Sequence, residues 1–148
     1  MKFSAMQYPP RTRIMTKREK PPAGYEPIKS ENPFGAAVGP LYEKKEGEGW
    51  VRGFRVENKH TNQGGIAHGG VLMTFADIVM ARAVLDVANL PFVTVQMNAQ
   101  FTAPARLGAW VEGRGFVTRR TKALAFVRCE IEVEGNPVLA SSGIFKIL

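Results

Sequence analysis

Residues 60–88 read HTNQGGIAHGGVLMTFADIVMARAVLDVA, and this stretch decides the fold. Its first part, 60–70, is rich in Gly, Asn and Thr and shows no hydrophobic periodicity, so we expect a loop there. From Gly70 to about Ala88 almost every residue is apolar, which at this length predicts a helix that is buried on most sides. Other elements must then wrap around this helix.

Strand-like runs lie on both sides of the predicted helix. Trp50, Phe54 and Val56 share one side of a period-2 pattern that starts at Gly49, which predicts a first strand. Four more runs follow the helix, and Gly135-Asn136-Pro137 predicts an antiparallel hairpin between the last two. These runs span 93–101, 109–118, 124–134 and 138–147. The pattern favours an α+β fold in which one long helix packs on the concave face of an antiparallel sheet that ends in a four-strand meander.

The composition limits the class of protein. A chain of 148 residues with 45% hydrophobic content suits a single domain with a real core. Its one cysteine, Cys129, cannot form an internal disulfide, which favours a reducing, cytoplasmic location. No run approaches the roughly 20 apolar residues that span a bilayer, so we expect no membrane partner.

The positive charge is concentrated at the N-terminus. The formal net charge is +7, and residues 1–30 hold seven basic against two acidic side chains, together with five prolines. We therefore expect a basic, poorly ordered extension over 1–30 and one domain over 31–148. The alternative is a basic arm with a partner of its own. Because the charge does not follow one face of the domain, we expect no nucleic-acid partner.

Asp77 is the unusual charge of the predicted helix. Arg82 and Asp86 are four residues apart and can pair on a solvent-facing stripe. Asp77 lies roughly 140° from Arg82 around the helix, so it points away from that stripe into apolar company. A carboxylate in such surroundings is a candidate functional group. The alternative is a structural acid that accepts a hydrogen bond, with Thr74 or Thr94 as the donor.

Other polar groups gather just before the helix. Unpaired N–H groups at Gly69 and Gly70 would favour a developing oxyanion. The alternative is that the two glycines only make a tight turn into the helix. His60 and His68 have no third ligand at helical spacing, so we expect no metal site. Cys129 lies on the apolar face of a predicted strand, which favours core packing over a nucleophile.

The segment 60–70 followed by Asp77 resembles the signature of the PaaI-like branch of the hotdog-fold acyl-CoA thioesterases. The spacing of Asn62, Gly65, His68-Gly69-Gly70 and Asp77 carries the resemblance, and it continues through VTVQMN at 93–98. It covers the chain from about Pro22 to Leu148. The resemblance implies a hotdog fold, in which a long central helix is wrapped by a curved antiparallel β-sheet, and a dimer whose sheets join edge to edge. Such dimers often pair into a homotetramer, a dimer of dimers.

The resemblance also implies roles for individual residues. Asp77 would attack the thioester carbonyl or activate water, and the Gly69 N–H, with Gly70 beside it, would bind the oxyanion. Asn62 would position the water or the carbonyl, His68 would flank the thioester, and Thr94 would hold the lytic water. Loop residues of one subunit would face Asp77 of the other. No cofactor is implied beyond the CoA of the substrate.

Three cations suggest where CoA binds. Arg119, Arg120 and Lys122 lie between two predicted strands, where they could hold the CoA phosphates. The alternative is a solvated basic turn.

The hotdog fold also serves two other functions. A hotdog acyl dehydratase would carry its His and acid in a different pattern, because here His68 directly precedes the glycine pair. A non-catalytic acyl-CoA sensor would be expected to lose Asp77 or to gain a DNA-binding segment. We therefore expect a thioesterase and leave its acyl group open.

Overall fold

The apolar run forms one long helix. In the computed structural model, which describes residues 19–29, 32–88 and 91–148, this helix is α2, Gly69–Val87. His68 caps its first turn, because the His68 Nδ1 accepts a hydrogen bond from the Gly70 N–H at 2.9 Å. The predicted bounds of the helix, 70–88, are confirmed to within one residue at each end.

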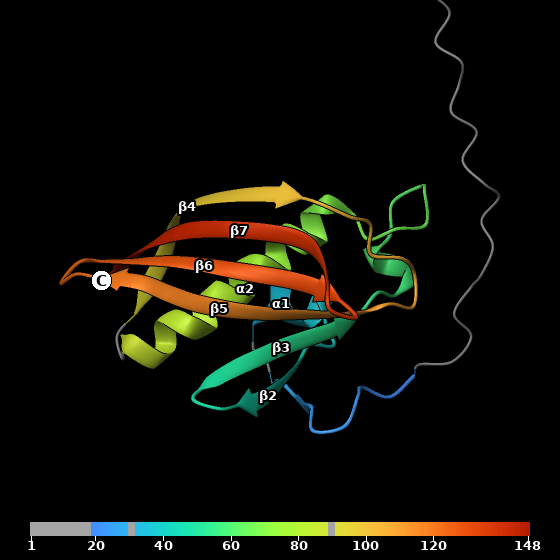
Figure 1. Cartoon of the computed structure of the whole chain (residues 1–148), viewed down its shortest axis with the longest axis horizontal. Helices are drawn as coiled ribbons and strands as arrows, with labels where there is room; N and C mark the ends of the chain where they lie inside the picture. Colours follow the sequence, from blue (N-terminus) through green and yellow to red (C-terminus); the bar gives the residue numbers. More distant parts are fainter. Residues whose placement is uncertain (1–18, 30–31, 89–90) are drawn as a thin grey trace, which may run out of the picture.

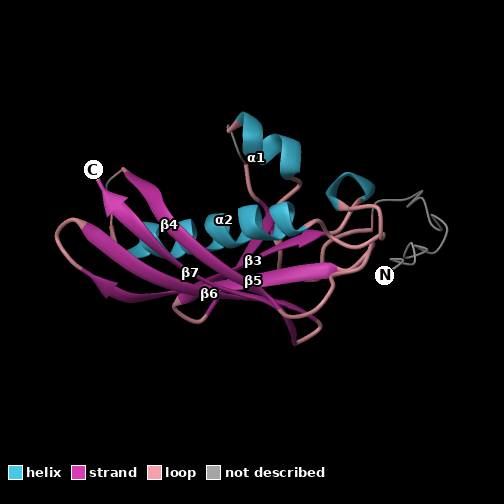
Figure 2. Ribbon diagram, turned by 90° about the horizontal axis from the view of Figure 1, so that it is seen from above, coloured by secondary structure: helices cyan, strands magenta, loops and turns pink. Residues whose placement is uncertain are grey.

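The strands of the described residues form one antiparallel sheet, and α2 lies along one of its faces (Figures 1 and 2). The order across the sheet is β1-β2-β3-β5-β6-β7-β4, so β4 is an edge strand. The expected α+β layout is confirmed. The strands are β1 Glu26–Pro27, β2 Tyr42–Glu46, β3 Gly49–Arg55, β4 Phe92–Phe101, β5 Trp110–Arg120, β6 Leu124–Val133 and β7 Asn136–Ile147.

The predicted four-strand meander is wrong in one respect. Strands β5, β6 and β7 are consecutive neighbours, but β4 pairs with β7 and not with β5. Alternating hydrophobicity identifies a strand without identifying its neighbour, so the sequence pattern could not show this crossover. The hairpin between β6 and β7 is confirmed, although its two turn residues are Glu134 and Gly135, both with positive φ.

In the described residues, three elements precede β3, which was predicted to be the first strand. They are β1, the short helix α1 at Pro33–Val38, and β2. The sequence of β2, YEKKE, is charged and has no apolar alternation, so it gave no strand signal. Asn32 caps α1 with its side chain, and Pro33 occupies its first turn.

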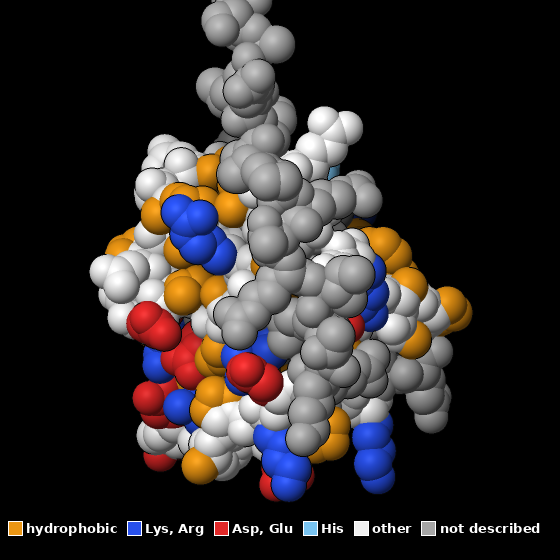
Figure 3. Space-filling view, turned by 90° about the vertical axis from the view of Figure 1, so that its right-hand side faces the viewer, with side chains coloured by type: hydrophobic (Ala, Val, Ile, Leu, Met, Phe, Trp, Pro, Cys, Tyr) orange, Lys and Arg blue, Asp and Glu red, His pale blue; other side chains and the backbone are white. Residues whose placement is uncertain are grey.

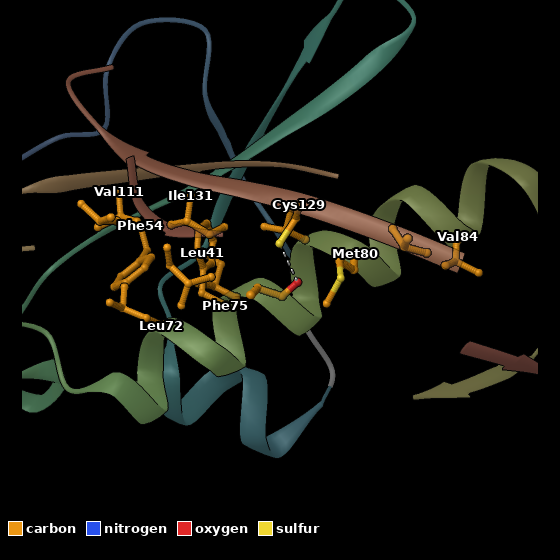
Figure 4. Close-up of a cluster of buried hydrophobic side chains, with 14 of the residues drawn as sticks. Leu41, Phe54, Leu72, Phe75, Met80, Val84, Val111, Cys129 and Ile131 are labelled. Atoms are coloured by element: carbon orange, nitrogen blue, oxygen red, sulfur yellow. Dashed lines mark hydrogen bonds between the residues drawn. The ribbon is translucent and has the colours of Figure 1, made fainter. Parts of the chain in front are cut away.

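The core lies between α2 and the inner face of the sheet (Figure 4). Phe54, Phe75 and Ile131 are fully buried there. Cys129 is also buried, and its thiol donates a weak hydrogen bond to the Ala76 carbonyl at 3.9 Å. Burial raises the pKa of the Cys129 thiol to about 12. The prediction that Cys129 packs in the core is therefore confirmed.

The expectation that α2 is buried on most sides is not met within one chain. Six residues of the helix are buried, but Met73, Leu85 and Val87 are 39%, 51% and 42% exposed. The sheet covers only one face of a helix that is apolar on several faces. The rest of this apolar surface is available to another chain.

Part of the N-terminal segment packs against the domain. Tyr25 is buried, its hydroxyl donates to Glu112 at 2.7 Å, and its ring packs edge-on against Trp110. Strand β1 begins directly after Tyr25 and pairs with β2. Residues 1–18, which hold most of the predicted extension, lie outside the described residues.

Candidate functional site

Asp77 faces the edge strand β4. It lies in the third turn of α2, is half-buried, and accepts a hydrogen bond from the Thr94 hydroxyl at 2.7 Å. Arg82 and Asp86, the two other charges of the helix, pair with each other at 2.8 Å as expected. Asp77 therefore keeps one oxygen held by Thr94 while the carboxylate stays partly open to solvent, which is a more polar setting than the predicted apolar one.

The segment before α2 is a closed loop. Thr61 bridges to Ala67 across it, and Gly65 takes the positive φ of 71° that lets the loop turn back. The Asn62 side-chain oxygen accepts from the Gly64 N–H at 2.8 Å, so its NH₂ group is the part left to meet a ligand. Asn62 is exposed.

The first turn of α2 leaves one N–H group open. The Gly70 N–H is bonded to the His68 ring, and the N–H groups of Val71 and Leu72 donate to the His68 carbonyl. Among the described residues no acceptor is paired with the Gly69 N–H. This donor lies at the positive end of the helix dipole, where a negative oxygen is favoured.

The two glycines leave space for the aromatic rings beside them. A Cβ on Gly69 would come within 3.3 Å of the Phe101 ring, and a Cβ on Gly70 within 3.0 Å of the His68 Nδ1. A side chain at either position would therefore push against the group beside it. The sequence raised the tight turn as an alternative explanation; the structure adds that both glycines are closely packed.

His68 has only one ring nitrogen available. Because its Nδ1 accepts from the Gly70 N–H, a neutral ring carries its proton on Nε2. His68 is exposed, so this Nε2–H can donate to a ligand. The capping bond thereby fixes both the position of the ring and its role as a donor.

His60 has a structural place instead. It is buried, accepts from the Glu57 N–H at 2.9 Å, and donates from Nε2 to the Val38 carbonyl at 2.7 Å. Burial lowers the pKa of its imidazole. No group of three or more His, Cys, Asp or Glu side chains that could hold a metal occurs in the described part of the chain.

The basic turn lies at the other end of the sheet from the loop. Arg119, Arg120 and Lys122 are exposed, and none of them has an ion pair among the described residues. The cross-strand pairs place Arg120 in one row with Ala125, Phe145 and Thr94. Paired residues point to the same side of a sheet, so Arg120 shares the face of Thr94.

A single chain does not bring all the predicted site residues together. Asp77 and Thr94 are in contact, and His68, Gly69, Gly70 and Asn62 share the loop and helix start. Asp77 follows Gly69 by eight positions in the helix, which corresponds to about 12 Å along the axis. One thioester carbonyl cannot meet both groups of the same chain.

The sequence pattern missed α1 and the contacts that hold it. Lys59 donates to the carbonyls of Ala37, at 3.0 Å, and Gly39, beside the His60 bond to Val38. The Asn32-Pro33 pair was the available signal, since it is a typical helix start. Figure 2 shows α1 beyond α2 as seen from the sheet.

The end of the molecule with the loop also carries many charges. In Figure 3, acidic and basic side chains lie next to one another on one side of this end. None of the helices in the described ranges is long and apolar enough to cross a membrane.

Comparison with known proteins bears on this arrangement. Residues 64–140 match the thioesterase superfamily. A Pseudomonas aeruginosa protein with the provisional name of an esterase is 31% identical over 129 residues, which are 85% of this chain and 96% of that protein. Acyl-coenzyme A thioesterase 13 of Homo sapiens is 32% identical over 90 residues, 60% of this chain and 64% of that protein.

A solved structure supports the same assignment. A variant of the phenylacetic acid degradation protein PaaI from Thermus thermophilus superposes with a TM-score of 0.71 at 30% identity, covering 79% of this chain and all of that chain. The long helix on a curved antiparallel sheet is the hotdog fold of these structures. The chain belongs to the thioesterase superfamily and is a PaaI-like, hotdog-fold thioesterase.

Proposed function

We propose that the chain hydrolyses acyl-CoA, with Asp77 as the catalytic carboxylate. The observation that carries the proposal is the bond between Asp77 and the Thr94 hydroxyl, which fixes a half-buried carboxylate at an open sheet edge. The name of the human relative, an acyl-coenzyme A thioesterase, supports this substrate class. In the net reaction, water and the thioester give the free acid and the CoA thiol, with the C–S bond broken and a C–O bond formed.

The carboxylate can serve this reaction in two ways. As a general base, Asp77 takes a proton from water that the Thr94 hydroxyl group helps to hold. As a nucleophile, Asp77 attacks the thioester carbon, the C–S bond breaks, and CoA leaves as a thiolate that takes a proton from solvent; water then opens the resulting anhydride and restores the carboxylate. In both routes the negative oxygen that develops on the carbonyl is held by the Gly69 N–H, with the His68 Nε2–H and the Asn62 amide as further donors.

A dimer would complete the site. Strand β4 is an open edge, and Val93, Val95 and Phe101 on it are 47%, 59% and 52% exposed. If two β4 edges pair antiparallel, the end of one strand lies beside the beginning of the other. The end carries Phe101 against Gly69, and the beginning carries Thr94 with Asp77. The oxyanion donor of one subunit would then meet the carboxylate of the other.

The basic turn fits the CoA in the same dimer. Arg120 shares the row and the face of Thr94, so Arg120 lies on the Asp77 side of its own subunit, with Arg119 and Lys122 beside it in the chain. Arg119, Arg120 and Lys122 are exposed and have no ion pair in the described ranges, so their charges are available to phosphate groups. We assign the CoA phosphates to this turn.

Release of free thiol from a panel of acyl-CoA thioesters tests the proposal. Asp77→Asn should keep the fold and lower kcat by about 10³-fold, because the amide can act neither as the general base nor as the nucleophile. Asp86→Asn is the matched control, since Asp86 lies on the same helix in a surface ion pair. Replacing Arg119, Arg120 and Lys122 by Glu should raise KM with little effect on kcat.

The outcome also separates thioesterase from sensor. Near-normal turnover in a folded Asp77→Asn dimer would remove Asp77 from its role. Tight binding of acyl-CoA without thiol release by the wild type would favour the non-catalytic sensor.

A further inference from the structure

A groove runs between α1 and the first turns of α2. Its volume is about 390 Å³, and its walls include Phe34 and Val38 of α1 and Val71 and Thr74 of α2. His68 lies at one end of it. Phe34 is 60% exposed, which is unusual for so large an apolar side chain and leaves its ring available to a ligand.

The groove lies beside the proposed oxyanion donor. Gly70 lines the groove, and Gly69, whose N–H group is open, is the preceding residue in the same helical turn. An acyl group whose carbonyl oxygen accepts from Gly69 therefore has the groove next to it. Because the α1 and α2 walls are mostly apolar, they suit the acyl group, while the basic turn suits the phosphates.

The groove is short. From Gly70 to Thr74 the helix advances by about 6 Å. A narrow recess beyond it, enclosed by Leu41, Phe54 and Ile78, has a free volume of about 10 Å³. That is about the room of one water-sized probe, so a chain that enters the groove cannot continue into the core.

The α1 wall is held in place by the loop of the site. Lys59 donates to the Ala37 and Gly39 carbonyls, and His60 donates to the Val38 carbonyl. The width of the groove is therefore set by fixed backbone contacts and by the side chains of Phe34 and Val38.

We propose that this groove is the acyl subsite and that Phe34 and Val38 determine its specificity. It takes a compact acyl group, about the length of one ring or of four to five carbons, in preference to a long linear chain. Phe34 covers the acyl group at the rim, and Val38 closes the way to the recess. This inference rests on the acyl-CoA thioesterase function proposed above.

The test compares kcat/KM for butyryl-, benzoyl-, octanoyl- and palmitoyl-CoA. The wild type should favour the first two. Phe34→Ala should raise KM for them about 10-fold with kcat nearly unchanged, since apolar contact with the acyl group is lost. Val38→Ala should join the groove to the recess and raise the octanoyl to butyryl ratio at least fivefold.

Matched variants make the result decisive. Phe116→Ala removes an exposed ring from the other face of the sheet and should leave the acyl profile unchanged. Phe34→Trp, at an exposed position, narrows the groove without touching the core. It should lower kcat/KM for benzoyl-CoA more than for the other substrates. If Phe34→Ala, Phe34→Trp and Val38→Ala all keep the wild-type order of kcat/KM across the four substrates while Asp77→Asn is inactive, the assignment of the acyl subsite is wrong. The proposed thioesterase function would not be affected by that outcome. If the wild type releases no thiol from any substrate, the proposed function itself fails.

Discussion

The two edges of the sheet differ in how they are protected. The edge at β1 and β2 is short and charged, with β1 only two residues long and β2 reading YEKKE. Glu43 and Glu46 of β2 form ion pairs with Arg52 and Arg114. Charge and short length are the usual means by which a sheet edge avoids pairing with another chain.

The β4 edge has neither kind of protection. It is ten residues long, has no charged side chain, and exposes Val93, Val95 and Phe101. It also carries Thr94, the partner of Asp77. The unprotected edge is therefore also the one beside the proposed catalytic carboxylate, which fits the proposal that a second copy completes the site.

The largest effect is expected from a charge on the β4 edge. Val95→Lys should split the dimer and lower turnover at least 100-fold, because a lysine on a pairing edge opposes strand addition. Size-exclusion chromatography with light scattering measures the oligomeric state, and thiol release measures turnover. Lys45→Glu on β2 is the control and should change neither the oligomeric state nor the turnover. A monomeric Val95→Lys protein with full activity would show that each chain holds a complete site.

A moderate effect is expected at the charged edge. Arg52 donates to Glu43 at 3.1 Å and to the Ile78 carbonyl of α2 at 2.9 Å. Arg52→Met should lower the free energy of unfolding by about 1–3 kcal/mol, since it removes the donor to the Ile78 carbonyl and leaves Glu43 with Arg82 alone, at 3.7 Å. Chemical denaturation measures this loss. The dimer should persist, and dissociation of this variant would contradict the assignment of assembly to β4.

The smallest effect is expected from pH, at His60 in the segment between β3 and α2. Burial lowers the pKa of His60 below its ordinary value of 6.5, so the unfolded chain binds a proton more readily than the folded one. The stabilising effect of the neutral ring is complete above pH 6.5 and is lost as the pH falls toward the pKa of the folded state. Each unit of difference corresponds to about 1.4 kcal/mol.

Unfolding of the wild type and of His60→Gln between pH 7.5 and 5 checks this. The wild type should lose more stability on acidification than the variant. Parallel losses in the two proteins would assign the pH dependence to other groups.

Much of the fold was readable from local pattern. The helix bounds came from an uninterrupted apolar run, and the faces of β6 came from strict alternation, with Val127, Cys129 and Ile131 buried as expected. The charged strand β2 and the short helix α1 were missed, because neither has a hydrophobic period. The place of β4 beside β7 was also missed, since strand order depends on contacts far apart in the chain.

The candidate site divides in the same way. The sequence by itself determined the fold class, the helix that carries Asp77, the packing of Cys129 and the family, because these follow from residue type and spacing within short windows. Only the tertiary structure decided that Thr94 is the partner of Asp77, that the His68 Nδ1 accepts from the Gly70 N–H, and that Gly69 keeps a free N–H among the described residues. These are distances and angles between groups, and they exist only when separate elements are packed against one another.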